Sequence, residues 1–113
     1  MFQILVVEDD RALRELFCTV LSKNGFVYYE AADGLAAWDV LEKHYIDLVI
    51  SDIMMPNMDG YELVRSLRKG GYNMPVLMIT AKDTFEDLQS GFTAGTDDYM
   101  VKPVNVNEMI LRI

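Results

Sequence analysis

The chain has 113 residues, of which 51% are hydrophobic and 25% charged, a size and composition that suit one globular domain and exclude a disordered tail. With 18 acidic against 10 basic residues the formal charge is −8, which argues against unaided binding to nucleic acid or to an anionic membrane surface. A lone cysteine excludes an internal disulfide, and the lack of a leader or a long apolar run leads us to expect a soluble, cytoplasmic protein.

The first part of the chain predicts a strand followed by an amphipathic helix. The apolar run 4–7 is rich in branched residues and predicts the strand. Apolar residues then recur at helical spacing and predict a helix that ends at Asn24-Gly25. The apolar stripe of this helix is Leu13, Leu16, Phe17, Val20 and Leu21. Cys18 has no ligand or catalytic partner in a recognisable motif, so we interpret it as a packing or surface residue of the helix.

The same alternation continues to a third strand. Runs 26–29 and 48–50 predict the second and third strands, and the apolar residues of 37–41 mark a helix between them. Asp33-Gly34 and Asp59-Gly60 each precede a helical stripe, so we interpret both pairs as helix starts and not as hairpin turns, and Asp59 as an N-cap.

The second half of the chain repeats the pattern to its last residue. Third, fourth and fifth helices are expected over 63–67, over 85–92 and from Asn107, and the fourth and fifth strands over 76–79 and 99–101. The last helical stripe reaches the final residue without a C-cap. We therefore expect residues 1–113 to be one domain that stops inside its last helix, without an effector domain, and that derives from a longer protein or a trimmed chain.

This order of elements predicts an α/β fold. Strict alternation with short connections favours a doubly wound, five-stranded parallel sheet of order 2-1-3-4-5 flanked by five helices, because each crossover must be right-handed and carry its helix over one face. All strand carboxyl ends then lie along one edge, and a ligand site is expected beside strands 1 and 3.

Polar side chains follow the strands at this edge. They are Glu8, Asp9 and Asp10 after the first strand, Asp52 at the end of the third, Thr80 after the fourth, and Lys102 and Pro103 after the fifth. Carboxylates gathered this closely repel one another and raise each other's pKa unless they share a cation. Mg²⁺ suits such a site, because it prefers hard oxygen ligands and needs neither histidine nor cysteine.

Asp9 and Asp52 are the predicted direct ligands of Mg²⁺, for which Mn²⁺ is expected to substitute. The backbone carbonyl of Met54 is a third protein oxygen within reach. Glu8 or Asp10 could hold a metal-bound water, and one of the two could instead cap the first helix.

Asp52 is also a predicted nucleophile, since a carboxylate can attack phosphorus and form an aspartyl phosphate. Lys102 lies about two strand spacings away, roughly 10 Å, and its long side chain can neutralise Asp52 before the reaction and a phosphoryl oxygen afterwards. Thr80 supplies a hydroxyl donor to another phosphoryl oxygen. Positioning and charge compensation are what phosphoryl transfer mainly requires.

Over its whole length the sequence resembles the receiver domain of two-component response regulators, a flavodoxin-like fold. The motifs that carry the resemblance are "ILVVEDD", "DIMMPNMDG", "ITA" and "GTDDYMVKP". The resemblance implies that Asp52 is the phosphorylation site, Glu8 and Asp9 the acidic pair, Thr80 the switch hydroxyl, Tyr99 the rotating aromatic and Lys102 the conserved base. It also implies that Ala81 contacts the phosphoryl group and that the Lys102-Pro103 bond is cis.

The resemblance further implies a signalling role and not a conventional enzyme activity. In that family a sensor histidine kinase donates the phosphoryl group, and the receiver catalyses the transfer and its own slow dephosphorylation. Phosphorylation then remodels the surface of the fourth helix, fifth strand and fifth helix, a local charge event that biases a two-state element.

The nearest subfamily by resemblance is that of the winged-helix transcription factors, whose receivers dimerise through this surface. The residues that suggest it are Glu86, Asp87, Asp97, Asp98 and Arg112. Two positions depart from the pattern: Leu88 stands where a basic residue is expected, and Val104 replaces a frequent phenylalanine. Both departures bear on the dimer and not on the phosphoacceptor.

Three alternatives compete with this interpretation. A metal-dependent phosphatase would need a second acid two residues after Asp52, where the chain has Met54. A flavin- or nucleotide-binding module would need a loop after the first strand that cradles phosphate, whereas "EDDRALRE" would repel it. A phosphorylation-independent scaffold of the same fold is the third.

Overall fold

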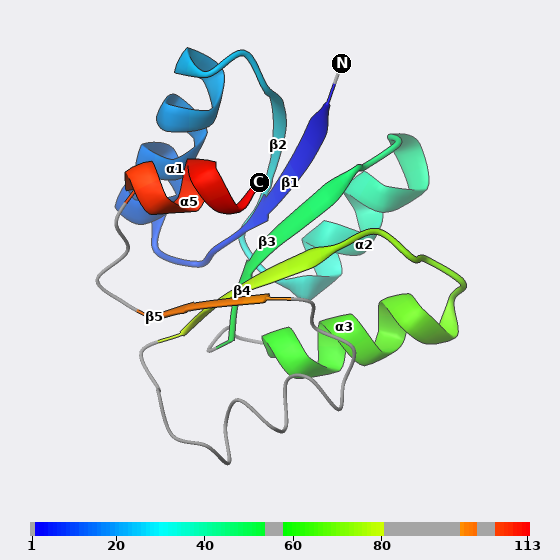
Figure 1. The fold of residues 1–113 in the computed structure, drawn as a ribbon. Helices are drawn as coiled ribbons and strands as arrows, with labels where there is room; N and C mark the ends of the chain where they lie inside the picture. The colour runs from blue at the N-terminus through cyan, green and yellow to red at the C-terminus, as the bar shows by residue number, and fades with distance from the viewer. Residues whose placement is uncertain (1, 54–57, 81–97, 102–105) are drawn as a thin grey trace.

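The computed structural model describes residues 2–53, 58–80, 98–101 and 106–113, and Figure 1 shows their arrangement. The strands are β1 (Gln3–Val7), β2 (Val27–Ala31), β3 (Leu48–Asp52), β4 (Val76–Thr80) and β5 (Asp98–Val101). The helices are α1 (Arg11–Lys23), α2 (Gly34–Lys43), α3 (Gly60–Lys69) and α5 (Val106–Arg112). The helix predicted over 85–92 lies outside the described residues.

The strands form one parallel sheet in the order β2-β1-β3-β4-β5, which is the order that the alternation of elements predicts. β3 lies at the centre, with β1 on one side and β4 on the other. The register places Val7 beside Ser51 and Asp52 beside Ile79. The carboxyl ends of β1 and β3 therefore meet at the same edge, as expected for a doubly wound sheet.

Helices cover both faces of the sheet, and each face has its own buried cluster. α2 and α3 pack on one face, where alternate strand residues such as Leu5, Val7 and Val49 are buried. α1 and α5 lie beside each other over the opposite face, which takes Ile4 and Val6. Side chains alternate along a strand, so a central strand buried on both faces must be continuously apolar.

Aspartate side chains begin the three longest of the described helices. Asp10, Asp33 and Asp59 have extended backbones, and each accepts a hydrogen bond from the N–H three residues on. The interpretation of both Asp-Gly pairs as helix starts is confirmed. Of the two alternatives for the acidic loop, Asp10 is the residue that caps α1.

The second strand differs in its limits from the prediction. Phe26 donates its N–H to the carbonyl of Leu21 and so belongs to the turn that closes α1, while the strand continues to Ala31. β2 is an edge strand, and Tyr28 and Glu30 are exposed while Val27 and Tyr29 are half-buried. Because β1 is the one strand paired with β2, the outer edge of β2 has no strand beside it in the described sheet.

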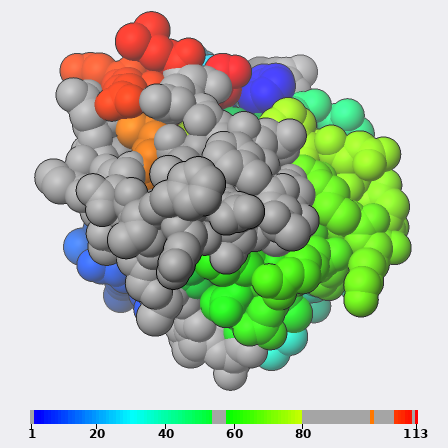
Figure 2. Space-filling view, turned by 60° about the horizontal axis from the view of Figure 1, so that its bottom comes forward, coloured from blue at the N-terminus to red at the C-terminus, as the bar shows by residue number. Residues whose placement is uncertain are grey.

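The surfaces of α3 and α5 lie apart in the space-filling view of Figure 2, as expected for helices on opposite faces of the sheet. Among the described residues, none of the helices is long and apolar enough to span a bilayer.

Candidate functional site: an acidic cluster at the carboxyl edge of the sheet

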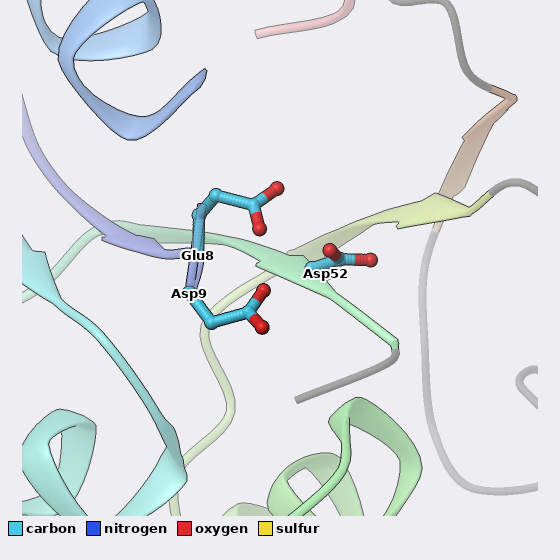
Figure 3. Close-up of side chains that lie close together, drawn as sticks. All are labelled: Glu8, Asp9 and Asp52. Carbon is cyan, nitrogen blue, oxygen red and sulfur yellow. The ribbon is translucent and has the colours of Figure 1, made fainter. Parts of the chain in front are cut away.

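Three carboxylates come together where β1 and β3 end. Glu8 and Asp9 directly follow β1, and Asp52 is the last residue of β3. Because Val7 and Ser51 are register partners, the next residue of each strand carries its carboxylate to the same edge. Figure 3 shows the side chains of Glu8 and Asp9 extending toward the side of the sheet where Asp52 lies.

The cluster is tight and largely buried. One carboxylate oxygen from each of Glu8, Asp9 and Asp52 lies within 4.8 Å of the others. Glu8 is only 1% exposed and Asp52 5%, whereas Asp9 faces solvent. One side of the cluster is therefore fixed in the protein interior and the other is open to an incoming ion or ligand.

Burial and the neighbouring carboxylates raise the pKa of Glu8 from its ordinary 4.5 to about 8. Desolvation is the largest cause, and a hydrogen bond to Asp52 adds to it because that bond favours the protonated acid. Asp10 opposes the shift by donating its N–H to Oε2 of Glu8 at 3.2 Å. Ionisation of Glu8 beside the other two carboxyl groups is therefore unfavourable unless a cation is bound.

Main-chain contacts hold Asp52 in place. The N–H of Ile53 donates to Oδ1 of Asp52 at 2.7 Å, and the N–H of Gly60 donates to the carbonyl of Ile53 at 2.8 Å. A Cβ added to Gly60 would lie 2.5 Å from the backbone carbonyl oxygen of Asp52. The start of α3 can therefore approach the end of β3 this closely only because residue 60 has no side chain.

The donor set fits a hard divalent cation. Its members are oxygen atoms of carboxylates, with no nitrogen or sulfur among them, and they are close enough for one ion to contact more than one. A bound dication would also lower the raised pKa of Glu8, because its positive charge favours the ionised form of the carboxyl group. Acidic residues at strand ends are thus brought together in a form that suits Mg²⁺.

Some of the other predicted site residues lie within the described part of the chain, and others do not. Thr80 ends β4, next to the strand that carries Asp52, and its register partner is Val101. Tyr99 lies in β5 opposite Met78. Of the predicted dimer surface, Asp98 lies in β5 and Arg112 in α5. The positions that fall outside the described residues are Met54, Ala81, Glu86, Asp87, Asp97, Lys102 and Pro103.

Sequence reasoning missed one residue that contacts the acidic loop. Arg14, on the first turn of α1, donates from Nη1 to the backbone carbonyl of Glu8 at 2.7 Å. It also donates from Nε to Glu30 at 3.2 Å. The available signal was two basic residues, Arg11 and Arg14, in the first turn of the helix after the acidic loop, a pattern that is too common to single one of them out.

Cys18 and His44 have structural roles. Cys18 is buried at 3% exposure, and burial raises the pKa of its thiol to about 12. His44 caps α2 and stacks on Tyr29 with ring centroids 4.2 Å apart. A cavity of about 570 Å³ lies at the opposite, amino edge of the sheet, lined in part by Asp47 and Tyr72. It is remote from the carboxylates and contributes nothing to their chemistry.

Comparison with known proteins identifies the family of the chain. Residues 4–113 match the model of the response regulator receiver domain. Response regulator MprA of Mycobacterium sp. (strain KMS) is 42% identical over 111 residues, which are 98% of this chain and 48% of the relative. MprA of Mycobacterium avium (strain 104) is 41% identical over 98% of this chain and 49% of its own length. The chain thus spans about half the length of the curated relatives it matches.

Solved structures show the same fold. The Francisella response regulator 1452 receiver domain superposes with a TM-score of 0.94 at 34% identity, covering 99% of this chain and 93% of the other. Chemotaxis protein CheY4 of Vibrio cholerae gives a TM-score of 0.95 at 32% identity, covering 99% and 95%. The parallel sheet, the acidic edge and these matches agree: the chain belongs to the response regulator receiver domain family.

Proposed function

We propose that this domain accepts a phosphoryl group on Asp52 from a sensor histidine kinase, in a reaction that depends on Mg²⁺. The observation that carries the proposal is the convergence of Glu8, Asp9 and Asp52 within 4.8 Å at the edge where β1 and β3 end. Burying the carboxylate at the end of a strand costs free energy unless a cation pairs with it, so a buried carboxylate in this position indicates a binding or reactive group.

Asp9 and Asp52 would hold the Mg²⁺ directly, with the Met54 carbonyl as a third oxygen and Glu8 acting through a water molecule. Mn²⁺ would substitute at the same oxygens. When bound, the ion supplies charge compensation for the carboxylates and for the oxygens of the incoming phosphoryl group.

The chemistry of this chain rests on Asp52. A carboxylate oxygen of Asp52 forms the new P–O bond while the P–N bond of the kinase phosphohistidine breaks and the imidazole leaves with the electron pair. In the proposal, Lys102 compensates the charge of the phosphoryl oxygens, and Thr80 and Ala81 donate hydrogen bonds to them. The same site would hydrolyse the acyl phosphate slowly, so the domain is a self-modifying acceptor and not a turnover enzyme.

Phosphorylation would act outside the site through Thr80 and Tyr99. Their movement would change the surface of β5, α5 and the segment before β5, which could then form a homodimer. The acidic residues of that surface would pair across it with Arg112. We further propose an attached or partner output domain that regulates transcription, as in the winged-helix subfamily, and a cytoplasmic location.

The decisive test is intact-mass spectrometry after incubation with acetyl phosphate and Mg²⁺. We expect one added phosphoryl group, which Asp52→Asn or EDTA abolishes. Asp59→Asn is the matched control, because Asn retains the cap of α3 and the same charge is removed from a residue outside the site. Modification of the Asp52→Asn protein would contradict the assignment.

Two further outcomes would favour other functions. Steady turnover of a phosphate monoester by the unmodified chain would indicate a phosphatase. A folded protein that binds Mg²⁺ but takes no phosphoryl group from any phosphodonor would indicate a phosphorylation-independent scaffold.

A further inference from the structure

The acidic loop is tied to the rest of the molecule by a guanidinium that belongs to neither strand of the site. Arg14 is largely buried, with 16% of its side chain exposed. One of its donors bonds the carbonyl oxygen of Glu8 at 2.7 Å, and another bonds Oε1 of Glu30 in β2 at 3.2 Å. The planar fork of an arginine can make both bonds at once.

Glu8 is held on its other side by the same strand. Its N–H donates to the carbonyl of Ala31 at 3.0 Å, and Ala31 directly follows Glu30. Both backbone groups of Glu8 are therefore connected to the end of β2, one directly and one through Arg14.

These bonds determine where Asp9 lies. The carbonyl of Glu8 is part of the peptide unit that ends at the Cα of Asp9, and that unit is planar. A contact that fixes the carbonyl direction also fixes the direction in which the chain enters Asp9. Arg14 bonds the backbone carbonyl of Glu8, so this contact orients the loop.

The loop needs such a restraint because its carboxylates repel one another. Glu8, Asp9 and Asp52 have oxygen atoms within 4.8 Å, and Asp9 lies on the exposed side, where the loop could move outward to relieve the repulsion. A loop that relaxes in this way would separate Asp9 from Asp52 and lose the paired ligands before the cation arrives.

We propose that Arg14 is a positioning residue that holds Glu8 and Asp9 in register with Asp52 for the divalent cation. The inference rests on the proposed function, because it concerns the same cation site. Arg14 touches neither the ion nor the phosphoryl group; it acts through the peptide between Glu8 and Asp9, with Glu30 as its anchor on β2.

A purely electrostatic role makes the opposite prediction. Replacing Arg14 by an uncharged residue removes a positive charge near the acidic cluster, and Coulomb's law alone then predicts tighter binding of Mg²⁺. A positioning role predicts weaker binding, despite the more negative protein. The sign of the change in affinity therefore distinguishes the two roles.

The experiment is a titration of the intact chain with Mg²⁺, followed by the backbone amide signals of residues 8–10 and 53 in NMR spectra. Arg14→Met keeps most of the aliphatic stem and removes both donors. Arg11→Met is the matched control: it loses the same charge from the same helix, and its pair with Glu15 is exposed, with side chains 82% and 60% accessible.

We expect Arg14→Met to weaken Mg²⁺ binding about tenfold, the usual order for a group that orients a metal ligand. Arg11→Met should stay within about twofold of the wild type, as expected for an exposed ion pair. Arg14→Lys should give an intermediate affinity, because one ammonium can bond the Glu8 carbonyl but lacks the fork that also holds Glu30.

Binding by Arg14→Met that is as tight as wild type, or tighter, would overturn the inference. If that variant does not fold, Arg14→Lys decides: unchanged affinity in the lysine variant refutes positioning. A wild-type chain that shows no Mg²⁺ binding would instead refute the proposed function, and the inference with it.

Discussion

Glu8 and Asp52 are carboxylates in positions where a parallel sheet normally carries apolar side chains. Both are at least 95% buried, and burial, together with the neighbouring carboxylates, raises the pKa of Glu8 to about 8. The fold tolerates this arrangement because the backbone donors of Asp10 and Ile53 each bond one of the carboxylates. At the scale of single residues, the clustered carboxylates carry an electrostatic cost that a bound cation would relieve.

Repulsion within the carboxylate cluster predicts that Asp52→Asn stabilises the metal-free protein. The substitution removes the charge of one of the three clustered carboxyl groups, while the amide oxygen can still accept from Ile53 N–H. We expect the free energy of unfolding in EDTA to rise by about 1 kcal/mol, equivalent to relief of roughly one pKa unit.

Urea denaturation measures this change. Asp39→Asn, which removes the same charge from an exposed position of α2, should leave stability within about 0.5 kcal/mol of wild type. Equal stabilisation by both variants would show that net charge, and not the cluster, is responsible.

At the scale of elements, the connection from β3 to α3 shapes the site. The Gly60 N–H bonds the Ile53 carbonyl, and the Asp59 side chain caps the helix by accepting from Glu62 at 2.8 Å. The helix therefore starts directly against the strand end that carries Asp52. The absence of a side chain at residue 60 is what permits this approach.

This packing predicts that Gly60→Ala destabilises the domain by about 1–3 kcal/mol, the usual cost of overpacking. The added Cβ would lie 2.5 Å from Asp52 O, 2.8 Å from Met78 Sδ and 2.9 Å from Ile53 Cα. Two of these atoms belong to the backbone, so the helix or the strand end must shift.

Gly70→Ala is the control for this variant. Gly70 has a right-handed helical backbone, and a Cβ there would be 3.1 Å from one ring atom of Trp38, a side chain that can move slightly. Chemical denaturation of both variants gives the comparison, and a cost at Gly60 no larger than at Gly70 would contradict the packing argument.

At the scale of the whole molecule, the net charge of −8 and the acidic edge of the sheet both contribute electrostatic repulsion. Monovalent salt screens the general repulsion, but only a divalent cation at the cluster gains from shared carboxylates. The domain is also only part of what its curated relatives contain, since the chain spans about half their length.

We predict that Mg²⁺ stabilises the domain more than NaCl of equal ionic strength. At ten times its dissociation constant, a ligand that binds only the folded state adds about 1.4 kcal/mol to the free energy of unfolding. Thermal or urea denaturation in paired buffers measures the difference, and Asp9→Asn should reduce it. Identical stabilisation by the two salts would argue against a specific cation site.

Patterns local in the chain predict much of the fold and the acidic residues of the site. Apolar runs separated by helical stripes predict a parallel sheet, because strands covered on both faces must be continuously hydrophobic. Asp-Gly pairs before helical stripes predict two helix starts, and the cap at Asp59 depends only on a contact three residues away. The acidic residues of the site are recognisable because each directly follows or ends a predicted strand.

The tertiary structure decided which of these residues meet and how deeply they are buried. The register of β1 against β3 brings Glu8 beside Asp52, and the chain between them carries no local signal of that distance. The bonds from Arg14 to Glu8 and Glu30 likewise join three elements. Such contacts depend on the packing of helices on a twisted sheet, a property of the assembled molecule, whereas periodicity and caps reflect the nearest few residues.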